Sequence, residues 1–78
     1  MTRELVVYAR WDDEANVWVA TSEDVPGLAT EAPNWDHLVR KLKAIIPELL
    51  DANGHADGDE IPFKVLGEVR EVAHREAA

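Results

Sequence analysis

Short apolar runs rich in β-branched and aromatic residues open the chain and predict three strands. These runs are residues 5–11 (LVVYARW), 17–22 (VWVATS) and 28–32 (LATEA). A polar five-residue connection at 12–16 separates the first two runs and has the ordinary length of a β-hairpin connection. Pro26 and Gly27 before the third run suit the two central positions of a tight turn. We therefore expect the first strand to pair antiparallel with the second, and the second with the third.

The segment that follows has the period of an amphipathic helix. Its apolar residues form one stripe and are Trp35, Leu38, Val39, Leu42, Ile45, Ile46, Leu49 and Leu50. Asn34 is the expected N-cap, and Gly54 is the expected stop after the last turn. Pro47 lies inside the stripe and removes one helical hydrogen bond, so we expect a kink or a break near Lys43.

The last apolar run, residues 61–67 (IPFKVLG), predicts a fourth strand. Val69 and Val72 are expected to extend it beyond a bulge at Gly67. The element order β-β-β-α-β is that of an α+β fold in which one helix packs on a mostly antiparallel sheet. A chain of 78 residues has room for one domain, which we place at residues 1–78.

The register of the first hairpin decides which side chains the helix covers, because neighbouring residues of a strand point to opposite faces. If Trp11 pairs with Val17, one face is aliphatic, and Tyr8, Arg10 and Trp18 lie on the other, where the last two would form a cation–π pair. A single helix covers only one face, so we expect the second face or the last strand to contact a partner or a second copy. The expected interface residues are Tyr8, Trp18, Phe63, Val65 and Leu66.

Charge excludes several partners. The chain has 8 Lys and Arg against 16 Asp and Glu, a net charge of −8, which disfavours direct binding to nucleic acid or to anionic lipid. The acids gather in loops at 12–14, 23–24 and 57–60, which predicts largely apolar sheet faces. No apolar run is long enough for a secretory signal or a membrane span, so a cytoplasmic location is expected.

Residues with catalytic or metal-binding chemistry are present, but not in productive spacings. The histidines are His37, His55 and His74. They lie far apart without metal-ligand spacing, and Asp57 and Asp59 match only a fragment of a calcium loop. The chain has no cysteine, and its single serine, Ser22, lacks a nucleophile-elbow motif. We therefore expect no enzymatic activity, no metal and no cofactor.

Residues 11–28 (WDDEANVWVATSEDVPGL), followed by Thr30-Glu31-Ala32 and a helix that ends in PELL, resemble the HicB-like antitoxin superfamily. The resemblance covers about residues 4–66 and is closest to a small single-domain branch without the C-terminal DNA-binding segment. It implies a sheet like that of a truncated ribonuclease H without its catalytic carboxylates, and no enzymatic role. Well-known members bind and neutralise a small basic messenger-RNA-cleaving toxin, HicA. Because this chain stops at Ala78, DNA binding is not implied for it.

Together these observations predict a non-enzymatic protein-interaction module that forms a homodimer and binds a small basic HicA-like toxin. Its acidity suits a basic partner through electrostatic complementarity. The alternative is a stand-alone structural or small-ligand-sensing domain, which the missing DNA-binding segment and the aromatic face would also fit.

Overall fold

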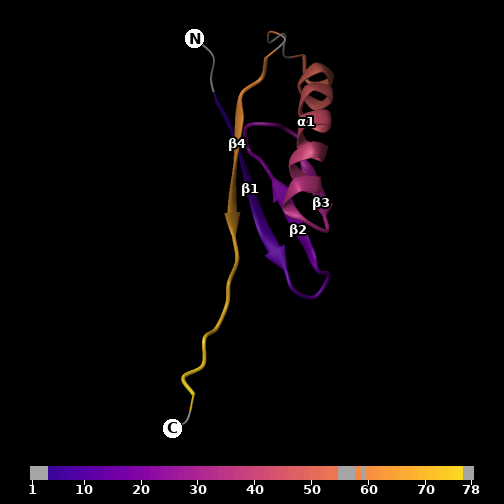
Figure 1. The fold of residues 1–78 in the computed structure, drawn as a ribbon. Coiled ribbons are helices and arrows are strands. Elements are labelled where there is room, and N and C mark those ends of the chain that lie inside the picture. The colour runs from indigo at the N-terminus through magenta and orange to yellow at the C-terminus, as the bar shows by residue number, and fades with distance from the viewer. Residues whose placement is uncertain (1–3, 55–57, 59, 77–78) are drawn as a thin grey trace.

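One helix packs on a four-stranded mixed sheet in the computed structural model, which describes residues 4–54, 58 and 60–76 (Figure 1). The strands are β1 (Leu5–Asp12), β2 (Val17–Thr21), β3 (Ala29–Ala32) and β4 (Phe63–Glu68), and the helix α1 spans Trp35–Ala52. The strand order is β3-β2-β1-β4, with β1 antiparallel to β2, β2 antiparallel to β3, and β4 parallel to β1. The predicted β-β-β-α-β order and the α+β fold class are confirmed.

The core lies between α1 and one face of the sheet. Four large side chains of the α1 stripe are buried, and the sheet positions beneath them include small alanines that leave room for the helix. The buried residues are Val7, Ala9, Ala20, Val25, Leu28, Ala32, Leu38, Leu42, Ile46 and Leu50, each at most 5% exposed.

The predicted helix ends are confirmed. Of the kink or break expected near Lys43, the break is wrong. The Asn34 side chain accepts a hydrogen bond from the His37 N–H at 2.8 Å, and Gly54 takes a φ of +76° after the last turn. The helix continues through Pro47 without a break. The proline removes one hydrogen bond, whereas Ile46 and Leu50 beside it stay packed in the core, and this packing keeps the helix continuous.

The hairpin register differs by one residue from the expected pairing of Trp11 with Val17. Trp11 pairs with Trp18, and the last pair of the ladder is Asp12 with Val17. Asp12 joins the strand because its Oδ1 accepts hydrogen bonds from the N–H groups of the next turn, at 3.0 and 3.3 Å. Asn16 completes the tighter connection with a φ of +56°. A short polar side chain tolerates this left-handed conformation.

This register moves Trp18 to the face that α1 covers. Its ring lies edge-on to Trp11, with centroids 5.6 Å apart, and edge-on to Trp35, with centroids 4.9 Å apart. Arg10 pairs with Val19 instead, on the opposite face. The expected cation–π contact between Arg10 and Trp18 is therefore wrong, because the two side chains point to opposite sides of the sheet.

Gly67 lies against the rings of Trp35 and Trp18 and is not part of a bulge. It pairs with Ala9 in the regular register of β1 and β4, which contradicts the expected bulge. A Cβ at Gly67 would lie 2.8 Å from a ring carbon of Trp35. The absent side chain lets the indole of α1 lie directly on β4, and this contact ties the start of the helix to the last strand.

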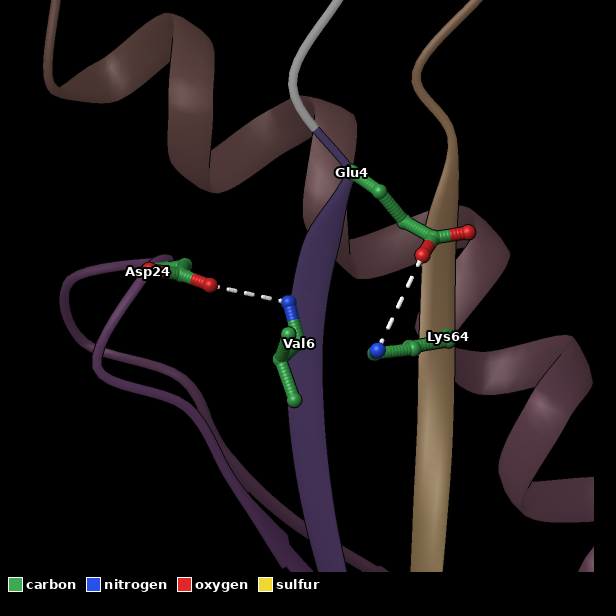
Figure 2. A network of polar contacts seen from close by, with 4 residues as sticks. All are labelled: Glu4, Val6, Asp24 and Lys64. Atoms are coloured by element: carbon green, nitrogen blue, oxygen red, sulfur yellow. Dashed lines mark hydrogen bonds and ion pairs between the residues drawn. The ribbon is translucent and has the colours of Figure 1, made fainter.

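Side chains complete the hydrogen bonding of β1 where β2 no longer runs beside it (Figure 2). The Val6 N–H donates to Asp24 Oδ2 at 2.9 Å, and the Ser22 hydroxyl donates to the Val6 carbonyl at 2.6 Å. Ser22 Oγ also accepts from the Asp24 N–H at 3.1 Å. The turn after β2 thus substitutes for a strand, since Val6 is half-buried and both its backbone groups need partners. Toward β4, Glu4 and Lys64 form an exposed ion pair at 3.9 Å.

The Gly67→Ala variant should unfold more easily than the wild type. Its new methyl group meets the Trp35 ring, and overpacking of this kind costs about 1–3 kcal/mol of unfolding free energy. Urea denaturation measures the difference. Gly58→Ala is the matched control, because nothing lies within 4 Å of a Cβ there. Equal midpoints for the two variants would contradict the proposed contact.

The Asp24→Ala variant should lose about 1–2 kcal/mol of unfolding free energy, because the half-buried Val6 N–H loses its acceptor. Asp24→Asn keeps an acceptor oxygen in the same place and should lose much less. Thermal unfolding of both variants tests the acceptor role. That role would be contradicted if the alanine variant melted with the wild type.

Candidate interaction surface

The face of the sheet opposite α1 is open (Figure 1). The strand registers assign to this face every second residue of each strand. We call it the uncovered face, and its residues are Val6, Tyr8, Arg10, Asp12, Val17, Val19, Thr21, Ala29, Glu31, Lys64, Leu66 and Glu68.

The centre of the uncovered face is apolar and its surroundings are charged. Tyr8 and Leu66 are register neighbours on β1 and β4 and remain 56% and 46% exposed. They line a depression together with Val19, Arg10 and Glu68. Charges of both signs therefore flank the exposed apolar side chains. The expectation of a largely apolar face is wrong. Successive side chains of a strand point to opposite faces, and the acids and bases of these strands occupy positions that point to this face.

The structure separates the five predicted interface residues into two groups. Tyr8 and Leu66 lie on the uncovered face, as a partner surface requires. Trp18, Phe63 and Val65 lie on the covered side, where they are half-buried against the core. Their participation in an interface stays a prediction, and Phe63 and Val65 belong to the edge strand β4.

Sequence reasoning missed Val19 as a member of the uncovered face. The one-residue error in the hairpin register exchanged it with Trp18. The sequence did contain a signal for the observed register. The side chain of Asp12 can accept a hydrogen bond from the N–H of Glu14, two residues later, and an aspartate in this position commonly closes a short loop.

A second exposed feature is the outer edge of β4 with the segment that follows it. β4 is the last strand of the order and pairs with β1 on one side. Residues 69–76 continue from it away from the body and are exposed throughout (Figure 1). Val69 and Val72, which were expected to extend the strand, follow its end at Glu68 and are 48% and 77% exposed.

The described residues bring no group of three metal-ligating side chains together. His37 lies in the first turn of α1, and His74 lies in the exposed C-terminal segment. His55, Asp57 and Asp59 lie outside the described residues. Ser22 uses its hydroxyl in the hydrogen bonds to the backbone of β1 and of the following turn.

A hollow lies between α1 and the segment that leads into β4. It is lined mainly by apolar side chains, together with one base and one acid. The lining residues are Lys43, Ile46, Pro47, Glu60, Ile61, Pro62 and Phe63. Within the described residues, no helix has the length and apolar character needed to cross a membrane.

Comparisons with known proteins agree with this fold. The crystal structure of a hypothetical protein from the extremely thermophilic bacterium Thermus thermophilus is similar to this chain, with 48% sequence identity and a TM-score of 0.71. The match covers 94% of this chain and 100% of that one. None of the curated proteins matches. The model of one family matches residues 4–75, nearly the whole chain, and the chain therefore belongs to the family described as Domain of unknown function (DUF1902).

Proposed function

We propose that this chain is a cytoplasmic, non-enzymatic protein-interaction module that self-associates and binds a small basic protein. The observation that carries the proposal is the uncovered face. A single copy leaves Tyr8 and Leu66 side by side in water at its centre. Adjacent exposed apolar side chains surrounded by polar residues are typical of protein-contact surfaces.

The charge of the chain favours a basic partner. The net charge is −8, and exposed acids stand around the sheet at the hairpin tip (Asp13 and Glu14) and in the turn after β2 (Glu23). Acids placed in this way attract a basic protein from a distance and oppose an acidic one. A partner with an apolar centre and a basic rim fits both the depression and the charge.

The resemblance to HicB-like antitoxins supports a specific kind of partner, a small basic toxin that cleaves messenger RNA. The observed β-β-β-α-β order is the one that this resemblance implies. The interaction would be neutralisation by direct binding, without a catalytic step on this chain.

A small-ligand-sensing domain is the second candidate, and the hollow between α1 and β4 favours it. Ile46, Pro47 and Phe63 supply an apolar lining, and Lys43 supplies one cation. A small apolar carboxylate has the matching chemistry. Titration with a panel of such acids, followed by the amide chemical shifts of α1, tests this candidate. Shifts that do not saturate would reject it.

The basic partner is best sought as the product of a neighbouring small reading frame, co-expressed with this chain. We expect the two proteins to purify together and the affinity to fall with salt, as screened charge attraction requires. Tyr8→Glu should weaken binding about ten-fold or more, because it places a charge in the apolar centre. Ala44→Glu adds the same charge on the exposed side of α1 and is the matched control.

Two results would contradict this proposal. Tyr8→Glu and Ala44→Glu with equal effects would show that the uncovered face is not the binding surface. Absence of any complex, together with unrelieved toxicity of the basic protein, would reject the antitoxin relation.

Self-association has its own measurement. Light scattering of the wild type at micromolar concentration should give twice the mass of one chain. A monomer mass under these conditions would reject self-association.

A further inference from the structure

We propose that two copies of this chain pair through the outer edge of β4 and residues 69–76, antiparallel about a two-fold axis at Val69. In this dimer, the C-terminal segment of each copy adds a strand to the sheet of the other. The inference rests on the self-association proposed above and names the surface responsible for it.

The outer edge of β4 offers main-chain groups for such pairing. The Leu5 N–H donates to the Pro62 carbonyl at 3.0 Å, and Leu5 is in register with Phe63. In a parallel ladder a residue bonds to the two residues that flank its partner. The even-numbered residues of β4 therefore bond to β1, while Phe63, Val65 and Gly67 direct their N–H and C=O groups outward. A free edge of this kind is a template for another strand.

The segment that follows β4, residues 69–76, has no regular secondary structure and lies beside no other strand of the described residues. It continues the direction of β4 away from the sheet, so the molecule is 61 Å long but only 26 and 19 Å in its other dimensions (Figure 1). Every residue from 69 to 76 is exposed. Val72 is 77% exposed, although valine is a residue that favours buried strand positions.

Symmetry limits how two such segments pair. Two identical antiparallel strands in one sheet are related by a two-fold axis perpendicular to that sheet. Facing residues then point to the same face of the sheet, so their numbers differ by an even amount. One residue faces its own copy across the axis, and this residue names the register. The two α1 helices consequently lie on the same side of the shared sheet.

The length of the segment limits the choice further. To cover the whole of β4 (Phe63–Glu68) with the segment after it, the axis must lie at Val69 or Arg70. An axis at Arg70 would place two guanidinium groups against each other, which is destabilising across a strand pair. An axis at Val69 places residues 70–75 of one copy along the full length of β4 of the other.

The Val69 axis also matches the side chains. Glu68 faces the partner's Arg70, and the two-fold axis repeats this pair. Within one chain Arg70 Nε already lies 3.1 Å from Glu68 Oε1, so four charges of alternating sign would surround the axis. Leu66, 46% exposed in a single copy, faces the partner's Val72. Opposite charges and apolar pairs at facing positions are the interactions that stabilise paired strands. Lys64 faces the partner's His74, which adds no attraction.

An axis at Leu66 is the main competing register. It would set Lys64 against the partner's Glu68, but it would place Val72 against Glu60 and leave residues 73–76 beyond the paired strands. Pairing of the C-terminal segments alone would form a two-stranded ribbon, which is marginally stable in water. The Val69 axis alone among these uses both the edge of β4 and the full exposed segment.

Charge reversal at the two facing positions tests the register. Glu68→Arg and Arg70→Glu each create two like-charge contacts across the axis, and each should raise the dimer dissociation constant about ten-fold. Glu71→Arg is the matched control, because position 71 faces the partner's Gly67 and the reversed charge meets no charged neighbour. Circular dichroism checks that each exposed substitution leaves the fold intact.

Mixing Glu68→Arg with Arg70→Glu distinguishes the proposed contacts between the two chains from the Glu68–Arg70 contact within one chain. In the mixed dimer both interchain pairs join opposite charges again, whereas each chain keeps its internal like-charge pair. Native mass spectrometry of an equal mixture should therefore show mixed dimers well above the statistical half. Under the Leu66 axis, position 70 would face Pro62, and no such excess would arise.

Failure of this inference is distinguishable from failure of self-association. A monomeric wild type at all concentrations would overturn both. A dimeric wild type whose two variants associate as tightly and mix statistically would overturn pairing at β4 and leave self-association standing.

Discussion

Burial of the α1 stripe against one face of the sheet is the constraint on which the rest of the structure depends. Leu38, Leu42, Ile46 and Leu50 are almost completely buried, and they cover only the side of the sheet that carries Val7 and the alanines. One helix cannot lie on both faces, so the opposite side of the same strands stays open. The uncovered face therefore follows directly from the way the core is built.

The tryptophan cluster fixes where that surface lies. Trp35, at the start of α1, contacts Trp18 and lies over Gly67, so it ties the helix to β2 and β4 at once. With β4 held in register against β1, Tyr8 and Leu66 become neighbours on the uncovered face. A substitution at Gly67 on the covered side would therefore also affect the position of Leu66 on the uncovered face.

Parallel pairing of β4 with β1 determines the position and direction of the C-terminal end. The connection through α1 returns the chain in the direction of β1, and β4 becomes an edge strand that points its following residues away from the body. Had β4 been a central strand, its main-chain groups would be satisfied within one copy. As an edge strand followed by an exposed segment, it leaves the outward main-chain groups of β4 and residues 69–76 accessible in a single copy.

The sequence by itself determined the elements. Its apolar runs predicted the first three strands and the last one, and its apolar stripe and capping residues predicted the helix and both of its ends. It also identified Tyr8 and Leu66 as surface candidates, because these features depend on neighbours in the chain. The tertiary structure decided the hairpin register, the continuity of the helix through Pro47 and the role of Gly67. A strand changes face with each residue, so the hydrogen bonds of Asp12 in the loop were enough to exchange Trp18 with Val19. Packing between distant residues, which no local pattern records, kept the helix whole and placed Trp35 on the glycine.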